Sequence, residues 1–299
     1  MANTFQRPAE AAGSLTLGGD LRVNRLGFGA MRITGEGIWG APANKREALA
    51  VLRRTLELGI NLIDTADSYG PDVSEELIAE ALYPYAKELV IATKGGLLRT
   101  GPGQWPQDGR PEHLREALEG SLRRLRLERI DIYQFHRPDP KVPFEESVGE
   151  LARLQKEGKI RHIGLSNITI EQLTQAQKIV PIVTVQNHYN LAKRESEQMT
   201  MQASEQMIDI CARQGIGFIP WSPLTMGKLA QAGGVVEQIA KQRQVTPNQV
   251  VVAWLLQRSS TMLPIPGTST VQHLEENAIG ATLRISEEEF TSIDQASRR

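Results

Sequence analysis

Four polar side chains of different chemical type follow three short apolar runs of the sequence. Asp64 and Tyr69 follow the first run, Lys94 the second and His136 the third. Taken singly, each has an ordinary structural role: Asp64 as a helix cap, Lys94 as a solvated charge, His136 as a loop histidine. Together they place an acid, a phenol, an ammonium and an imidazole at the same end of consecutive strands. We therefore treat them as a candidate catalytic set.

Such a set suits the reduction of a carbonyl group. When hydride reaches a carbonyl carbon, negative charge grows on the oxygen, and a proton donor must lie beside it. A free phenol has a pKa of ~10, which a neighbouring ammonium lowers, while a carboxylate keeps that ammonium charged. We predict that Tyr69 is the acid, Lys94 tunes it, Asp64 pairs with Lys94, and His136 orients the carbonyl oxygen or passes the proton.

The elements that position these residues alternate between strands and helices. Segments with helical spacing, such as Leu114, Leu118, Leu122 and Leu125, separate short apolar runs that read as strands. Alternation of this kind predicts right-handed crossovers and a parallel sheet, and eight units predict closure. The fold class is therefore α/β, a (β/α)8 TIM barrel, whose active site lies at the carboxyl ends of the strands. The eight predicted strands are residues 26–30, 60–63, 89–93, 130–135, 162–165, 182–186, 216–219 and 262–265.

The chain of 299 residues is long for one domain, but a single barrel can run to ~250 residues or more. A β-hairpin is predicted at residues 15–24, around Gly19 and Asp20. With no linker, we predict a tail over residues 1–14 and one barrel domain over residues 15–299. The glycines at 27 and 29 match a dinucleotide-binding turn only weakly, and we interpret them as small residues inside a strand.

Composition excludes several other functions. A formal net charge of −1 argues against nucleic-acid or acidic-membrane partners. The single cysteine, Cys211, forms no internal disulfide and is predicted to be a buried thiol, and no spacing of ligands suggests a metal site. The apolar run at 250–256 is too short to span a membrane, and the start lacks the pattern of a secretion signal, so we expect a cytoplasmic protein. A repeated Ser-Glu-Gln-Met, at 196–199 and 204–207, predicts a tolerated surface insertion.

From about Leu15 to about Asp294 the sequence resembles the aldo-keto reductase superfamily, in a branch that includes bacterial reductases of pyridoxal. The resemblance implies a (β/α)8 barrel, a nicotinamide cofactor bound without a Rossmann motif, and the tetrad Asp64, Tyr69, Lys94 and His136. The motifs that carry it are Gly-Ile-Asn-Leu-Ile-Asp-Thr-Ala-Asp-Ser-Tyr-Gly at 59–70, Thr93-Lys94, Asp-Ile-Tyr-Gln-Phe-His at 131–136, Gly-Lys-Ile-Arg-His-Ile-Gly-Leu-Ser-Asn at 158–167, Trp221-Ser-Pro-Leu224, Ile-Pro-Gly-Thr-Ser at 265–269, and Glu276-Asn277.

The same resemblance implies a cofactor site in four parts: residues that bind the carboxamide, an aromatic ring under the nicotinamide, a loop across the pyrophosphate, and a helix start that holds the adenosine. The residues in that order are Ser166, Asn167 and Gln186; Trp221; Ser222, Leu224, Gly227 and Leu229; and Gly267, Thr268, Ser269, Thr270, His273, Glu276 and Asn277.

Two departures from the family pattern concern the cofactor. Gly267 and His273 stand where many relatives have a lysine and an arginine that neutralise the 2′-phosphate of NADPH. Their absence weakens the preference without removing it, because Thr268, Ser269, Thr270 and His273 can still bond a phosphate. We favour NADPH, with NADH as the alternative.

The predicted function is therefore NADPH-dependent reduction of aldehydes or ketones to alcohols, a carbonyl reductase or alcohol dehydrogenase. Trp39 and Trp105 lie in long loops after the first and third barrel strands and are candidates to line the substrate pocket. One alternative is the oxidation of a sugar or polyol by the same residues. Another is a cofactor-binding regulatory subunit without turnover, which the intact tetrad argues against. The physiological substrate and the oligomeric state are not predicted.

Overall fold

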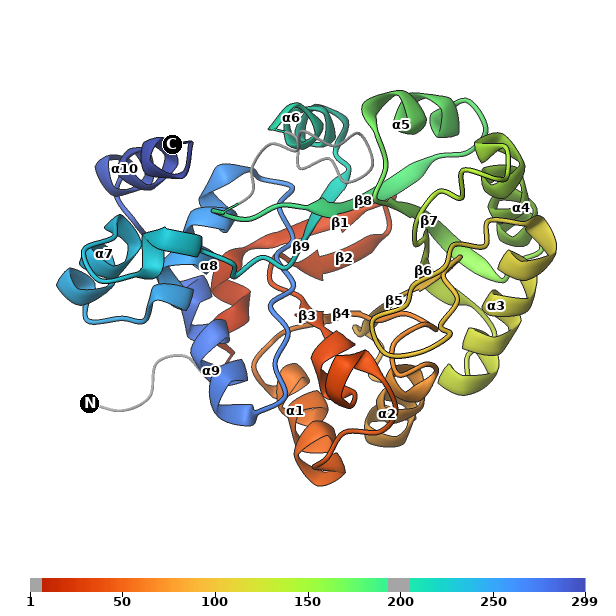
Figure 1. Cartoon of the computed structure of the whole chain (residues 1–299), viewed down its shortest axis with the longest axis horizontal. Coiled ribbons are helices and arrows are strands. Elements are labelled where there is room, and N and C mark those ends of the chain that lie inside the picture. Colours follow the sequence, from red (N-terminus) through yellow and green to blue (C-terminus); the bar gives the residue numbers. More distant parts are fainter. Residues whose placement is uncertain (1–6, 193–204, 299) are drawn as a thin grey trace.

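The computed structural model describes residues 7–192 and 205–298. Its centre is a parallel sheet of seven strands that follow one another in chain order and curl round (Figure 1). The strands are β3 (Phe28–Gly29), β4 (Leu62–Asp64), β5 (Val90–Gly95), β6 (Ile130–Phe135), β7 (Ile160–Ser166), β8 (Ile182–His188) and β9 (Gly217–Trp221). The predicted strand order is confirmed. Residues 196–199 and Ser204 of the repeated segment lie outside the described residues.

Helices follow the strands and surround them, as Figure 1 shows. Three of them begin with a capping box, in which a Thr or Ser side chain and a Gln or Glu three residues later exchange hydrogen bonds with the backbone. The α-helices are α1 (Lys45–Glu57), α2 (Val73–Leu82), α3 (Pro111–Leu125), α4 (Phe144–Lys156), α5 (Ile170–Gln177), α6 (Glu205–Gln214), α7 (Val235–Arg243), α8 (Pro247–Arg258), α9 (Val271–Ile279) and α10 (Glu287–Ser297). Short 3-10 helices are η1 (Pro8–Ala12), η2 (Ala30–Ile33), η3 (Glu36–Ile38), η4 (Gly227–Ala230) and η5 (Gly280–Thr282).

An extended segment, residues 261–265, closes the ring between β9 and β3. Leu263 N–H donates to the carbonyl of Phe218 at 2.8 Å, and Gly27 N–H donates to the carbonyl of Pro264 at 2.9 Å. Since Pro264 has no N–H, the segment forms an isolated bridge in place of a regular strand. The eight-unit barrel is thus confirmed, with an irregular eighth strand.

Glycine is required in β3 and directly before it because the closing segment approaches closely. A Cβ at Gly27 would lie 2.9 Å from the Ile265 side chain, and a Cβ at Gly29 would lie 2.7 Å from the Ile265 carbonyl oxygen. These glycines therefore serve packing within a strand, as predicted.

The barrel interior is filled from one end by the predicted hairpin, β1 (Ser14–Leu17) and β2 (Leu21–Asn24). Leu17, Leu21 and Val23 cluster there with inward-facing residues of the barrel strands. Ahead of the hairpin, η1 places Ala9 in the core, where its N–H donates to the carbonyl of Leu58 at 3.1 Å. The hairpin therefore plugs the end of the barrel opposite the carboxyl ends of the strands.

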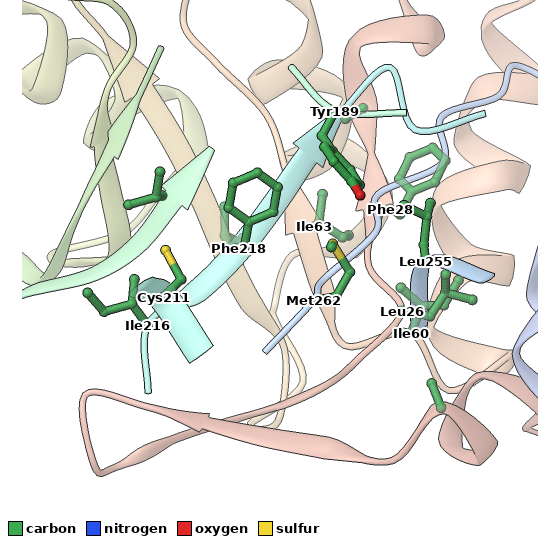
Figure 2. Close-up of a cluster of buried hydrophobic side chains, with 14 of the residues drawn as sticks. Leu26, Phe28, Ile60, Ile63, Tyr189, Cys211, Ile216, Phe218, Leu255 and Met262 are labelled. Atoms are coloured by element: carbon green, nitrogen blue, oxygen red, sulfur yellow. The ribbon is translucent and has the colours of Figure 1, made fainter. Parts of the chain in front are cut away.

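A second, larger apolar layer lies between the strands and the surrounding helices. Figure 2 shows a part of this layer, in which Phe218 of β9 and Met262 of the closing segment lie near Tyr189 and Cys211. Cys211 is fully buried, as predicted, and burial raises the pKa of its thiol to about 12. The thiol is therefore protonated and inert at neutral pH.

Candidate active site

A cavity of about 430 Å³ opens at the carboxyl ends of the strands. It brings together residues that are far apart in the sequence, as expected for this end of a barrel. The predicted residues that line it are Asp64, Tyr69, Trp105, His136, Ser166, Asn167, Gln186, Trp221, Ser222, Leu224 and Gly267.

Lys94 and Asp64 form a buried ion pair at the base of the cavity. The Lys94 ammonium lies 2.5 Å from a carboxylate oxygen of Asp64 and also donates to the carbonyl of Thr65 at 2.8 Å. Their side chains are 0% and 2% exposed. Burial by itself would lower the pKa of Lys94, but the charge of Asp64 and the contact with Tyr69 hold that pKa above its usual value. Lys94 is therefore a permanent cation.

The second carboxylate oxygen of Asp64 accepts two further hydrogen bonds. Gln134 Nε2 donates to it at 2.9 Å and Gln186 Nε2 at 2.8 Å. The amide nitrogen of Gln186, which the resemblance assigned to the cofactor, is thus engaged with the catalytic candidate. Gln134 was not predicted, although it lies two residues before His136, on the strand face that carries catalytic groups. Together the two glutamines fix the orientation of Asp64.

Tyr69 presents its phenol to the cavity. Its hydroxyl lies 3.5 Å from the Lys94 ammonium, and its ring makes edge contacts with the rings of His136 and Trp105. Burial raises the pKa of the Tyr69 phenol, and the nearby charge of Lys94 only partly opposes this. Lys94 thus lowers the pKa of the phenol as the sequence predicts, but burial outweighs this effect, and spacing says nothing of how completely the phenol is removed from water.

His136 is held as a neutral imidazole. Burial, together with the positive charges of Lys94 and Arg137, puts its pKa well below 6.5. Its Nδ1 lies 3.3 Å from the hydroxyl of Ser68, in the loop that carries Tyr69. The ring can therefore exchange a hydrogen bond with an uncharged group without adding a second cation beside Lys94.

The loop between Asp64 and Gly70 is fastened to the neighbouring strand. Thr65 N–H donates to the carbonyl of Ala92 at 2.8 Å, and Asp67 N–H donates to that of Lys94 at 3.2 Å. Because β5 itself carries Lys94, these bonds fix the tyrosine relative to the lysine.

Behind Lys94 lies a second buried polar group. Glu75 of α2 accepts hydrogen bonds from the Thr93 hydroxyl at 2.5 Å and from Arg124 Nε at 2.7 Å. The nearby Tyr133 hydroxyl is buried without a hydrogen-bond partner, and a Cβ at Gly95 would lie 2.1 Å from it. Glycine at 95 therefore leaves room for the Tyr133 ring beside β5.

On the opposite side of the cavity, Trp221 offers a flat aromatic surface. Its indole stacks on His188 with 3.9 Å between ring centroids and 5° between planes. Its Nε1 donates to Asn167 Oδ1 at 3.0 Å, and Asn167 Nδ2 donates to the Ser166 hydroxyl at 3.0 Å. Asn167 and Ser222 have φ angles of +57° and +53°, in the left-handed region. These residues are held in place before any ligand arrives.

The segment predicted to hold the adenosine begins its helix later than expected. The expected start at Gly267 is wrong: α9 starts at Val271, with Thr270 as its N-cap. Val271 N–H donates to a carboxylate oxygen of Glu47 at 2.9 Å, and the Thr268 hydroxyl accepts from Thr270 N–H at 3.2 Å. Donors expected to bind a phosphate thus already have protein partners.

The remaining cofactor candidates lie outside the cavity wall. Gly227 and Leu229 belong to η4, after β9. Ser269 and His273 are exposed near the start of α9, and Glu276 is half-buried within it. Asn277 is 3% exposed, and its Oδ1 has no hydrogen-bond partner.

Two observations fit a nicotinamide dinucleotide. A free indole face on the cavity suits a flat ring, and the buried acceptor of Asn277 suits the amino group of adenine.

At residue 267 a Cβ would lie 2.5 Å from the carbonyl oxygen of Gly29, which explains why no lysine stands there.

The two candidate tryptophans differ in position. Trp105 lines the cavity, whereas Trp39 lies outside its wall. Both pack on the guanidinium of Arg99, which lies 3.6 Å from the Trp105 ring centroid and 5.4 Å from that of Trp39. Arg99 also donates to the carbonyls of Ile38 at 2.7 Å and Ser68 at 2.8 Å. This unpredicted residue joins three loops at the mouth of the cavity.

Across residues 7–192 and 205–298, no three His, Cys, Asp or Glu side chains are grouped so that they could ligate a metal ion. Within the same ranges, no helix has the length and apolar character needed to span a membrane.

The sequence matches the model of the aldo/keto reductase family over residues 25–298. It is 42% identical to pyridoxine 4-dehydrogenase of Escherichia coli, over 94% of this chain and 97% of the relative. A thermostable aldo-keto reductase crystallised with the inhibitor epalrestat superimposes with a TM-score of 0.81, at 30% identity, over 95% of this chain and 99% of the other. An aldo/keto reductase from Klebsiella pneumoniae in complex with NADP and acetate gives a TM-score of 0.78, at 25% identity and 94% coverage of both chains.

The family model, the relative and the fold agree with one another and with the cavity at the carboxyl ends of the strands. The chain belongs to the aldo/keto reductase family of oxidoreductases.

Proposed function

We propose that the protein is a nicotinamide-dependent reductase of aldehydes and ketones in which Tyr69 donates the proton. The observation that supports this most is the position of the Lys94 ammonium, 2.5 Å from Asp64 and 3.5 Å from the Tyr69 hydroxyl. A cation held in this way stabilises the phenolate that remains after proton transfer.

The roles of the side chains follow from the charges. The bound reduced nicotinamide supplies hydride to the carbonyl carbon. Tyr69 then gives its proton to the oxygen on which negative charge grows. Neutral His136 holds the same oxygen by a hydrogen bond, and Asp64 keeps Lys94 charged. Because the phenol is buried, its proton leaves only when a developing oxyanion is there to take it.

For the cofactor we propose that Ser166, Asn167 and Gln186 bind the carboxamide, that Trp221 lies against the nicotinamide ring, and that Asn277 meets the adenine. NADPH remains our first choice, since a relative of this fold binds NADP. NADH is the alternative, because the carboxylate of Glu47 accepts a hydrogen bond from Val271 at the start of α9, where the 2′-phosphate of NADPH is expected to bind.

The test follows the absorbance of NADPH and of NADH with a panel of aldehydes that includes pyridoxal. Tyr69→Phe should lower kcat by at least about 100-fold, the usual contribution of a positioned acid. Tyr85→Phe, which removes a hydroxyl bonded to the Leu125 carbonyl far from the cavity, is the matched control. Equal rates for Tyr69→Phe and the control would show that Tyr69 is not the acid.

Oxidation of an alcohol is the second candidate, because a relative at 42% identity is a pyridoxine 4-dehydrogenase. The same residues serve both directions, with the Tyr69 phenolate as the base. The rate of pyridoxine oxidation with oxidised cofactor at high pH is compared with the rate of pyridoxal reduction.

A further inference from the structure

We infer that the carbonyl substrate carries an anionic oxygen group, and that the guanidinium of Arg137 binds this group. The inference specifies the substrate class for the same cavity and therefore rests on the proposed function. Arg137 directly follows His136 in the chain and lines the cavity together with Tyr69 and Trp105. An anion on Arg137 would thus lie on a molecule whose carbonyl reaches the phenol.

Arg137 is a half-buried cation without a partner in the part of the chain that the structure describes. Within residues 7–192 and 205–298 no carboxylate forms an ion pair with it, and its Nε is buried with no hydrogen-bond partner. Burial lowers the pKa of this guanidinium, because partial removal from water disfavours its charge. A charge taken out of water is costly unless it is paired, so such an arginine is suited to an anion supplied by a ligand.

Three aspartates of the loops and strand ends at this side of the barrel are engaged elsewhere. Asp139, two residues further along, accepts hydrogen bonds from the backbone N–H groups of Gly109 at 3.1 Å and Lys141 at 2.9 Å. Asp108 pairs with Arg110 at 2.6 Å. Asp64 is matched by Lys94. No carboxylate among the described residues therefore neutralises the charge of Arg137.

The other charges on the substrate side leave the balance positive. His136 is neutral, and the guanidinium of Arg99 is occupied by backbone carbonyls and stacked on Trp105. Leu97 and Trp105 supply apolar walls. The cavity thus suits an apolar or aromatic body with its carbonyl at Tyr69 and its oxyanion at Arg137.

The test compares substrates of equal shape and different charge. 4-Formylbenzoate carries a carboxylate, and 4-nitrobenzaldehyde replaces it with a neutral group of the same planar shape. Pyridoxal has a ring hydroxyl that is ionised near neutrality. Comparing it with 4-formylbenzoate shows whether Arg137 prefers a ring oxyanion or a carboxylate. Each is measured with wild type, Arg137→Met, Arg137→Lys and the surface control Arg123→Met.

Arg137→Met should lower kcat/KM for the preferred anion by about 10- to 100-fold, mainly through KM, because it removes a charged hydrogen bond. Arg137→Lys should recover part of the loss. The rate with 4-nitrobenzaldehyde should change by less than about 2-fold, and Arg123→Met should change neither. An equal loss for charged and neutral aldehydes, or no loss for either anion, would overturn the inference.

Binding without turnover provides a second readout. Isothermal titration with terephthalate and with neutral terephthalamide, at saturating oxidised cofactor, should show the dianion bound by wild type and weakened in Arg137→Met. If no aldehyde is reduced but this difference is present, the proposed function fails while the anion site stands. If neutral aldehydes are reduced but neither terephthalate nor any anionic aldehyde depends on Arg137, the anion site fails alone.

Discussion

The carboxylate of Glu47, in the first turn of α1, accepts a hydrogen bond from the backbone N–H of Val271, the first residue of α9, at 2.9 Å. It therefore occupies part of a helix N-terminus that would otherwise attract an anion. A 2′-phosphate bound there would be repelled by Glu47. We expect Glu47→Gln to tighten the binding of NADPH relative to that of NADH. The dissociation constant for NADH divided by that for NADPH should rise by about 3- to 10-fold.

Quenching of tryptophan fluorescence by each cofactor measures this ratio. The exposed Glu116→Gln, on α3, is the control for the loss of one negative charge. A ratio unchanged from wild type would mean that the phosphate binds away from α9.

Replacing Lys94 with Met should abolish activity and also destabilise the fold. The change leaves the Asp64 carboxylate buried without its cation, which typically costs about 3–5 kcal/mol. Adding Asp64→Asn should recover much of the stability, because the unpaired charge is then gone, but none of the activity. Urea unfolding and turnover of an aldehyde report the two effects. If the double variant is no more stable than Lys94→Met, the ion pair is not what holds this region together.

Stability should depend on pH through His136. Since its folded pKa lies well below 6.5, the unfolded chain takes up a proton that the folded chain does not as the pH falls below about 6.5. The contribution of His136 to stability is therefore present above that pH and lost as the pH falls toward the folded value. The difference in unfolding free energy between wild type and His136→Asn should shrink between pH 7.5 and 5.5, by at most about 1.4 kcal/mol per pH unit. A difference that is constant over this range would contradict the burial of a neutral ring.

Arg99 should control the shape of the cavity mouth. Arg99→Met removes the bonds to Ile38 and Ser68 and the contact with Trp105, so KM for aromatic aldehydes should rise several-fold while kcat changes less. Arg99→Lys should not restore KM, because an ammonium lacks the planar fork that reaches several carbonyls. Steady-state kinetics and the tryptophan emission of the protein, compared with a Trp105→Phe variant, report the change. Restoration by lysine would mean that charge alone matters.

Tyr133 and Gly95 should be coupled. Because the Tyr133 hydroxyl is buried without a partner, Tyr133→Phe should keep or raise stability, by up to about 1 kcal/mol. Gly95→Ala should be destabilising, since its Cβ would lie 2.1 Å from that hydroxyl. The two changes together should be less harmful than Gly95→Ala alone, as thermal unfolding of the four proteins would show. Simple additivity would contradict the contact.

Position along the chain sufficed to predict that Asp64, Tyr69 and His136 line one cavity. Asp64, Lys94 and His136 each directly follow a predicted strand, and parallel strands in a barrel bring their ends together whatever the details of packing. Gln134 was within reach of the same reasoning, because alternation places it on the face of Ile132 and His136. Its polarity at an inward position was the available signal.

Other features depend on contacts that no spacing reveals. Arg99 joins loops around residues 38, 68 and 105, and Glu47 meets Val271 across more than 200 residues of sequence. The direction of the Tyr69 pKa depends on how deeply the phenol is buried, which is a property of the finished packing. Spacing places groups at a site, but it does not give their solvation.

The ring of strands is held less firmly at the closing segment, residues 261–265, than at β5 and β6. Its bonds to β9 and to Gly27 are isolated, whereas β5 and β6 share a continuous ladder. Isolated bonds open locally at a lower cost in free energy than a ladder does, so we expect the amide hydrogens of this segment to exchange with solvent before those of β5 and β6. Ile265, Pro266 and Gly267 continue this segment into the cavity wall. The side of the barrel proposed to receive the long dinucleotide is thus expected to open more readily than the side formed by β5 and β6.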